Sequence, residues 1–490
     1  SMVSFNILSC DDVRNTINKS ILLLERVGVK FYHSEALKIL DSYGVTVDFK
    51  SRLAKIPESL TREALRKIPR SFTMYTLNGK PWLNLSEGNV YFAPGATAIK
   101  VIDLETDSVR TPTLIDEVNF VKLTDSLQNI HINAAPFSVF TDAPKILAER
   151  YRIAIAFKYS SKPFFGASFS LGGIQDMYRI ATTIIEPEDL QRKPRWAAHC
   201  CPSPPFKWSD IVTEINIECA KHSVPIIYLA MPIAGLTAPA TIIGAVTQCI
   251  AEDLAGLVLA QIINPGNPCI LGGSPITFDV KAAASSLGAI ETVMMNSCIA
   301  QIGKYLNLPT VGFIGISDSK TVDIQSAIEG AIGFTIGSLA GLNVIQGPGM
   351  LESESCQSYV KLVIDNEICG LALRAIKGVN TVEESFCIDV IENVGAGGDY
   401  SKNIYALKSI IDWARKEFYF PSQLIDRESR ESWERKGRKD MLIKAKEAAK
   451  KLINTSKAPL IDKETEEKIH SIIKEAAKKH NIIETIPKIP

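Results

Sequence analysis

The sequence predicts an α/β protein built around a (β/α)8 barrel, with an N-terminal helical extension and a C-terminal helical tail. Three observations predict this fold. Eight short apolar, β-rich runs recur along the chain, and their starts are separated by 42, 32, 31, 31, 43, 41 and 33 residues. Segments with helical periodicity lie between the runs, and this alternation predicts a parallel sheet with crossover helices. The runs are apolar without in–out alternation, as in strands buried on both faces. Eight such units favour a barrel, and an open doubly wound sheet is the alternative.

The elements follow this plan in order. Residues 1–88 are expected to form the helical extension, because 20–27 and 34–43 have helical spacing and each ends at a glycine, Gly28 or Gly44. Residues 89–350 hold the barrel. Its strands are expected at 89–93, 131–137, 163–169, 194–201, 225–231, 268–273, 309–316 and 342–347. Helices are expected at 143–159, 174–185, 208–221, 241–262 and 321–339. Residues 351–426 are expected to complete the barrel as a helical segment, and 427–490 to form a charged helical tail.

Charge and composition exclude several classes of protein. The 54 basic and 54 acidic side chains balance, so the basic excess of a typical nucleic-acid binder is missing. Two long uncharged stretches, 223–251 and 330–351, are interrupted by Gly, Pro, Thr or Asn, which favours a buried core over a membrane span. The ten cysteines form no CxxC pair, which favours free buried thiols and a cytoplasmic protein. Residues 427–490 carry 17 basic and 11 acidic side chains, so an acidic body is joined to a basic tail.

In a (β/α)8 barrel the active site lies on the loops that follow the carboxyl ends of the strands. Those ends are rich in aromatic and small residues and poor in paired carboxylates. Phe92, Phe137 and Phe169 could form a cage for a quaternary ammonium, although each could equally fill the barrel. Asp318 is the strongest polar candidate, and it could instead cap the helix expected after residue 320.

One His/Cys cluster, His199-Cys200-Cys201, stands at the end of the fourth expected strand. Adjacent strand residues point to opposite faces, so at most two of the three can face one site. A zinc site needs three or four converging ligands. Buried thiols beside a packed histidine are therefore favoured over a metal site, and no metal is expected.

Several motifs, taken in chain order, resemble the trimethylamine:corrinoid methyltransferase family. The resemblance starts near Val27-Gly28-Val29 and continues to Trp433-Glu434, so it covers most of the chain. The motifs that carry it lie at 225–228, 232–241, 317–325, 351–353, 362–368, 393–398 and 426–427. Archaeal members of the family contain pyrrolysine in the barrel, whereas this chain contains standard residues only. It therefore resembles the non-pyrrolysine, glycine betaine methyltransferase-like branch.

This resemblance implies a TIM barrel that moves a methyl group from a quaternary amine, such as a betaine, to the Co(I) corrinoid of a cognate corrinoid protein. The corrinoid would be carried by that partner, with no cofactor bound tightly to this chain. A quaternary nitrogen leaves as a neutral tertiary amine, so no catalytic acid or base is expected. The protein's task would be to orient the substrate and exclude water.

Two departures from the family pattern bear on the substrate. Gln346 stands where the family commonly has a histidine, and 399–405 replace the usual His-x-His-Thr-x-x-His pattern. Asp318 and Gln346 are the expected contacts for the substrate's non-reacting end, with His199 as a further polar contact. The alternatives are a barrel acting on another methyl donor or a phosphorylated metabolite, and a catalytically silent protein that binds a small cation. Self-association into a homo-oligomer is also open.

Overall fold

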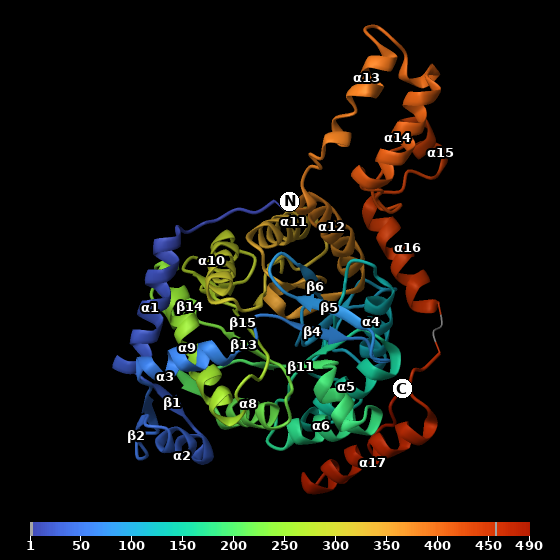
Figure 1. Ribbon diagram of the computed structural model, residues 1–490. Coiled ribbons are helices and arrows are strands. Elements are labelled where there is room, and N and C mark those ends of the chain that lie inside the picture. The colour runs from blue at the N-terminus through green and yellow to red at the C-terminus, as the bar shows by residue number, and fades with distance from the viewer. Residues whose placement is uncertain (1–2, 456–457) are drawn as a thin grey trace.

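The computed structural model describes residues 3–455 and 458–490. Its centre is a sheet of eight parallel strands in the order β6-β19-β18-β15-β13-β11-β10-β9 (Figure 1). The strands are β6 (Tyr91–Ala93), β9 (Asn133–Ala134), β10 (Phe164–Phe165), β11 (Trp196–Cys200), β13 (Ile226–Ala230), β15 (Cys269–Gly273), β18 (Thr310–Gly312) and β19 (Val344–Gln346). The last strand, β19, pairs in parallel with the first, β6. A hydrogen bond of 2.8 Å from the His131 amide to the Phe92 carbonyl joins the two ends of the sheet. The sheet is therefore a nearly closed barrel, and the fold predicted from the sequence is confirmed.

Each barrel strand lies within one of the eight runs expected from the sequence, and each is followed by a helix. The helices are α4 (Leu114–Ser126), α5 (Ala148–Tyr159), α6 (Gly173–Ile184), α8 (Asp210–Lys221), α9 (Ile242–Ile263), α10 (Ile290–Leu306), α11 (Ile324–Ala340) and α12 (Tyr359–Lys377). A further short helix, α7 (Pro187–Arg192), precedes β11. Eight strand–helix units make the (β/α)8 arrangement complete, with α12 as the eighth helix.

Helix α9 is the most apolar helix of the barrel. It is long and apolar enough to cross a membrane, but 78% of its most apolar 18-residue window is buried inside the protein. It packs against the barrel strands β13 and β15 and against α8 and α10. Helix α9 is thus a core helix, as the uncharged stretch around it predicts.

The N-terminal segment combines helices with short strands. It contains α1 (Cys10–Arg26), β1 (Val29–Phe31), α2 (Ser34–Ser42), β2 (Thr46–Asp48), β3 (Leu53–Lys55), α3 (Glu58–Lys67), β4 (Phe72–Tyr75) and β5 (Pro81–Leu85). The first three strands form a sheet with β12 (Lys207–Trp208), which follows β11 of the barrel. Gly28 turns the chain from α1 into β1 with φ +80°, and a Cβ there would lie 2.7 Å from the Ala54 carbonyl oxygen. The helices agree with the sequence pattern, whereas strands of three residues are too short to show one.

Small sheets lie above the carboxyl ends of the barrel strands. One consists of β7 (Lys100–Ile102), β8 (Val109–Arg110), β20 (Met350–Leu351) and β21 (Cys356–Ser358). A second consists of β14 (Ile233–Ala234), β16 (Ile276–Asp279) and β17 (Ala284–Ser286). They hold the long loops that border the cavity described below.

The C-terminal part consists of two pieces, which we call the arm (residues 379–435) and the wrap (residues 441–455 and 458–490). Helices α13 (Ile388–Val394), α14 (Ile404–Glu417) and α15 (Arg430–Arg435) project away from the barrel (Figure 1). Helix α16 (Met441–Asn454) then packs on α4 and α12, and α17 (Lys463–Lys479) packs on α5 and α6. The Lys158 ammonium contacts Glu466 at 2.6 Å and the Pro490 carbonyl at 2.9 Å. The wrap is therefore attached to the barrel by both apolar and polar contacts.

Candidate active site

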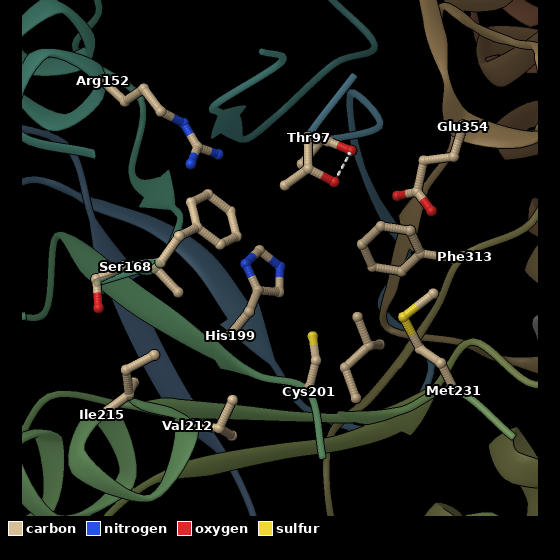
Figure 2. Close-up of a pocket in the computed structure, with 14 residues that line it drawn as sticks. Thr97, Arg152, Ser168, His199, Cys201, Val212, Ile215, Met231, Phe313 and Glu354 are labelled. Atoms are coloured by element: carbon tan, nitrogen blue, oxygen red, sulfur yellow. Dashed lines mark hydrogen bonds between the residues drawn. The ribbon is translucent and has the colours of Figure 1, made fainter. Parts of the chain in front are cut away.

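A cavity of about 250 Å³ opens at the carboxyl ends of the barrel strands (Figure 2). The lining residues come from the strands β11 and β13, from the loops after five barrel strands, from α5 and α8, and from the turn after β20. They are Ala96, Thr97, Arg152, Ala167, Ser168, Phe169, His199, Cys201, Val212, Ile215, Leu229, Met231, Phe313 and Glu354. Pockets for drug-sized ligands measure about 300–1,000 Å³, so a cavity just below this range suits a ligand smaller than those. The position is the one that the barrel fold predicts for an active site.

His199 lines the cavity, and its imidazole is hydrogen-bonded to Gln346. The Nε2 atom of His199 is 2.7 Å from Oε1 of Gln346, which is fully buried at the end of β19. Burial, helped by the nearby Arg152 charge, lowers the pKa of His199 to about 4. The imidazole is therefore neutral near pH 7, and because a carbonyl oxygen can only accept, Nε2 carries the proton. The structure brings these two predicted residues together, with His199 in the cavity lining and Gln346 behind it, outside the lining. The contact of either side chain with substrate stays a prediction.

The His/Cys cluster is divided between two faces of β11, as the strand geometry predicts. His199 and Cys201 line the cavity, whereas the buried Cys200 thiol lies 3.8 Å from the Val212 carbonyl oxygen of α8. Burial raises the pKa of Cys201 to about 12, so this side chain remains a thiol. Among residues 3–455 and 458–490, no group of three or more His, Cys, Asp or Glu side chains is placed to hold a metal ion.

The aromatic candidates occupy different positions. Phe169 lines the cavity at its rim and is 49% exposed. Phe92 and Phe137 are fully buried, with Phe92 edge-on to Phe334 and Phe137 edge-on to Phe120. These two rings lie in the packed barrel, outside the cavity lining, and their role in binding stays a prediction. A ring that the sequence reasoning missed, Phe313, lines the cavity instead. It directly follows β18, a position at which an aromatic residue could have been noticed.

Asp318 also lies outside the cavity lining. Its carboxylate accepts hydrogen bonds from the Ser286 hydroxyl and, at 3.2 Å, from the Gly288 amide. The cap of α11 is Asp323, which accepts from the Ser326 amide and forms a capping box with it. Asp318 thus ties the loop after β18 to β17. Its proposed contact with substrate stays a prediction.

Arg152 is the one buried cation among the described residues that line the cavity, and the sequence reasoning missed it. It lies in the middle of α5, is 2% exposed, and lines the cavity with its guanidinium end (Figure 2). Its Nη2 donates to the Ala135 carbonyl oxygen at 3.2 Å, and its guanidinium carbon lies 4.9 Å from the centre of the Phe169 ring. Its Nε and Nη1 have no hydrogen-bond partner among the described residues. Helix α5 also carries Glu149, Arg150 and Lys158, so nothing in the sequence singles out Arg152.

Glu354 lies on the opposite wall of the cavity from Arg152 (Figure 2). Burial raises the pKa of this half-buried carboxyl to about 8. Glu352, Ser353 and Glu354 all adopt left-handed φ values, of 50°, 51° and 80°. Such backbone is costly for residues other than glycine, and persists only where surrounding contacts impose it. The motif at 351–353 marks this turn in the sequence, but nothing there shows that Glu354 faces a cavity.

A family model described as trimethylamine methyltransferase (MTTB) matches residues 1–481. The chain is 28% identical over 479 residues to the trimethylamine methyltransferase MttB of Desulfitobacterium hafniense strain DSM 10664 / DCB-2, covering 97% of this chain and 95% of that protein. It is also 28% identical over 476 residues to the glycine betaine methyltransferase of D. hafniense strain Y51, covering 97% and 98%.

The monomethylamine methyltransferase of Methanosarcina barkeri, a solved structure, has the same fold. It matches with a TM-score of 0.53 at 12% identity, over 92% of this chain and 88% of that one. The barrel, the cavity at its carboxyl end and a family model that spans nearly the whole chain agree. The protein belongs to the trimethylamine methyltransferase (MTTB) family.

Proposed function

We propose that this protein is a corrinoid-dependent methyltransferase that moves a methyl group from a betaine-like quaternary amine to the Co(I) corrinoid of a separate partner protein. Family membership supports the class of reaction. The observation that carries the proposal is the cavity itself, which is small, mostly apolar and lined by a neutral imidazole. It suits a substrate that must be held and desolvated without being protonated or deprotonated.

The proposed chemistry needs no proton transfer from the protein. The corrinoid in its Co(I) state supplies the electron pair that accepts the methyl group. The N–CH3 bond breaks with its electron pair on nitrogen, so the amine leaves neutral. His199 and Cys201 suit this reaction because neither changes its protonation state near pH 7. Their task, with the apolar walls, is to orient the substrate and exclude water.

The corrinoid fits this chain as the cargo of a partner. The cavity of about 250 Å³ is sized for a small methyl donor, so the much larger corrinoid would be presented from outside by its partner protein. The rim residues Thr97 and Phe169 are exposed, so the donor can be approached from outside the barrel.

The proposal is tested with a corrinoid protein reduced to Co(I) and a panel of glycine betaine, proline betaine, carnitine and trimethylamine. We expect loss of the Co(I) absorbance and formation of the demethylated amine with at least one betaine, and neither change when the methyltransferase is omitted. If no compound of the panel is demethylated, the proposal fails for this substrate class. Calorimetric binding of a betaine without turnover would then support a silent binding protein, for which the Gln346 departure is the motivating observation.

A further inference from the structure

We propose that the cavity selects a zwitterion, with Arg152 binding the substrate's carboxylate and Glu354 facing its quaternary ammonium. This inference rests on the proposed function and assigns its specificity to two residues. Arg152 and Glu354 lie on opposite walls of the cavity, with His199 between them (Figure 2). Burial keeps Glu354, like Glu117, mainly protonated near pH 7, and a fixed cation placed beside it would favour its carboxylate form. A molecule with a carboxylate at one end and a fixed cation at the other therefore matches the two walls.

Arg152 has hydrogen-bonding capacity that the described residues leave unsatisfied. Two of its three nitrogens, Nε and Nη1, are buried without a hydrogen-bond partner among the described residues. A guanidinium stays protonated in proteins and presents its donors as a planar fork that matches a carboxylate. Leaving such a group buried and unpaired is costly. The bound carboxylate would supply the missing acceptor.

The neighbouring carboxyl groups of Glu117 and Glu149 lie close enough to favour the charged form of Arg152, but neither forms an ion pair with it. Glu149 is engaged by the Arg150 guanidinium at 3.1 Å and by the Ser170 hydroxyl. Glu117 is fully buried, and desolvation raises its pKa to about 8, so it is mainly uncharged near pH 7. The positive charge of Arg152 therefore remains available to a ligand.

The Phe169 ring covers the guanidinium of Arg152. The guanidinium lies 4.9 Å from the centre of the Phe169 ring, so one face of that ring is already occupied by a cation. Phe169 then shields Arg152 from water at the cavity rim. Phe313 is the lining ring on the Glu354 side of the cavity, and it is the ring placed to contact a substrate ammonium (Figure 2).

Backbone hydrogen bonds and an ion pair hold the turn that carries Glu354. The Glu352 and Ser353 amides donate to the carbonyl oxygens of Ser319 and Ser317, each at 3.0 Å. Lys100 pairs with Glu352 at 2.9 Å, which ties the turn to β7. These contacts impose the left-handed backbone and keep Glu354 at the wall, where its carboxyl has no hydrogen bond to any described residue. A quaternary ammonium cannot donate a hydrogen bond, so an unpaired carboxyl beside an aromatic ring suits it.

Three probes with the same fixed cation separate the two ends of the cavity. Glycine betaine carries the carboxylate, choline replaces it with a hydroxyl, and tetramethylammonium lacks the polar arm. Calorimetric titration of the wild-type protein is expected to show glycine betaine binding at least about 10-fold more tightly than choline, since a charge-assisted bidentate pair is strong. Equal affinity for glycine betaine and choline overturns the proposal, and this outcome depends on no variant.

Substitutions of Arg152 and Glu354 test which residue binds each end of the substrate. Arg152→Gln is expected to weaken glycine betaine binding at least about 10-fold while leaving choline binding unchanged, and Arg152→Lys to restore part of the loss. Glu354→Gln is expected to weaken all three probes by a similar factor. Arg179→Gln, which removes an exposed charge from α6 outside the cavity, is the matched control and is expected to bind like the wild type. An unchanged betaine-to-choline ratio in Arg152→Gln overturns the role of Arg152.

A turnover assay with the Co(I) corrinoid protein separates this inference from the proposed function. Glycine betaine that binds through Arg152 but is never demethylated, like every other amine tested, would refute the proposed function and leave the zwitterion site standing. Demethylation of trimethylamine at equal rates by the wild type and Arg152→Gln, with no preference for betaines, would refute the zwitterion site and leave the methyltransferase standing.

Discussion

At the scale of the residue, the cavity lining depends on the pair formed by His199 and Gln346. The two side chains come from β11 and β19, which are 147 residues apart in sequence, and meet at 2.7 Å. Gln346 also donates to the Pro94 carbonyl oxygen at 3.4 Å. The amide therefore fixes which imidazole nitrogen carries the proton and how the ring is oriented.

We expect Gln346→Ala to leave the buried His199 Nε2–H without an acceptor. An unsatisfied buried donor costs about 1–3 kcal/mol, so the free energy of unfolding is expected to fall by that amount. Chemical denaturation followed by tryptophan fluorescence measures it. Gln346→His, which restores the residue common in the family, is expected to lose less because a second imidazole can accept the bond. Gln325→Ala, an exposed change on α11, is the control, and a Gln346→Ala protein as stable as wild type would contradict this role.

The buried Glu117 makes the free energy of unfolding fall as the pH rises. Its two carboxyl oxygens are buried without hydrogen-bond partners among the described residues, and burial raises its pKa from 4.5 to about 8. Between these values the folded protein holds a proton that the unfolded chain has released. The contribution of Glu117 is therefore fully present below about pH 4.5 and is lost as the pH rises through about 8.

Glu117→Gln keeps the shape and removes the titration. The stability of this variant relative to the wild type is expected to rise with pH across the interval, by at most about 1.4 kcal/mol per pH unit. Unfolding free energies measured in parallel from about pH 5 to pH 8 give the difference. A difference that stays constant with pH would show that Glu117 is ionised in the folded protein.

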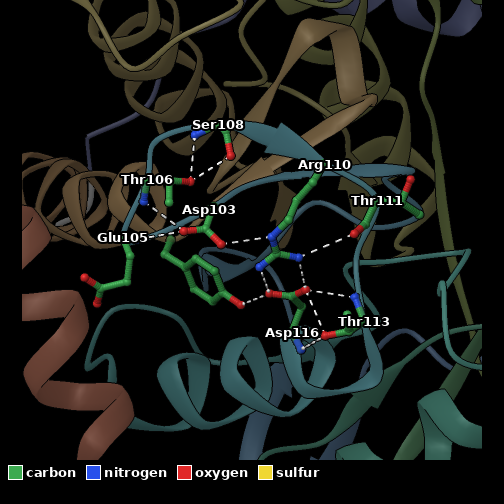
Figure 3. A network of polar contacts seen from close by, with 9 residues as sticks. Asp103, Glu105, Thr106, Ser108, Arg110, Thr111, Thr113 and Asp116 are labelled. Atoms are coloured by element: carbon green, nitrogen blue, oxygen red, sulfur yellow. Dashed lines mark hydrogen bonds and ion pairs between the residues drawn. The ribbon is translucent and has the colours of Figure 1, made fainter.

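At the scale of the element, a polar network joins the hairpin β7–β8 to α4 and α12 (Figure 3). Arg110 of β8 donates to both carboxylate oxygens of Asp116, at 2.6 and 3.0 Å, and to Asp103 at 2.9 Å. Tyr359 at the start of α12 donates to Asp116 at 2.6 Å. Strand β7 of this hairpin pairs with β21, which directly follows the Glu354 turn. The network therefore supports one wall of the cavity.

Asp116→Asn is expected to lower the free energy of unfolding by about 1.5–3 kcal/mol, the range for hydrogen bonds to charged groups. Burial alone would raise the pKa of Asp116, but the bonds from Arg110, Thr113 and Tyr359 outweigh it and hold the pKa below the ordinary value. The stabilising effect is thus present near neutral pH and lost in acid. Tyr359→Phe, which removes a single bond, serves as the comparison in the same denaturation series. If both variants lose equally little, the network does not support the hairpin.

The eight strands and the location of the site could be predicted from the sequence, whereas Arg152 and Glu354 could not. The eight strands were predictable because runs buried on both faces are continuously apolar, and the site followed because barrel strands end on one side. Arg152 could not be predicted as a cavity residue, because a helical pattern does not show that a long side chain in α5 reaches the strand ends. Glu354 could not be predicted as one, because its direction depends on left-handed backbone imposed by contacts with residues 317 and 319. Cavity residues held by distant contacts leave no local pattern.

At the scale of the whole molecule, the tail and the arm differ. The basic tail is partly a packed element, with Ile469 and Ile473 of α17 fully buried. Residues 379–420 of the arm are the opposite. They expose large apolar side chains along α13 and α14, among them Ile404 at 85% and Ile411 at 55%, and continue to Phe418 at 65% and Phe420 at 68%. Monomeric proteins rarely expose apolar patches larger than a few hundred Å², so we expect this arm to be covered in solution by a second copy of the chain.

The arm prediction is tested by light scattering after size-exclusion chromatography. The wild-type chain is expected to elute as a homo-oligomer, and the double substitution Ile404→Lys, Ile411→Lys to shift it toward the monomer, because burying two ammonium groups in an apolar contact is unfavourable. The melting temperature of the barrel should change little, since both side chains are exposed within one chain. Lys402→Ala, beside them on the arm, is the control. A wild-type chain that is already monomeric at micromolar concentration would show that the arm serves another contact.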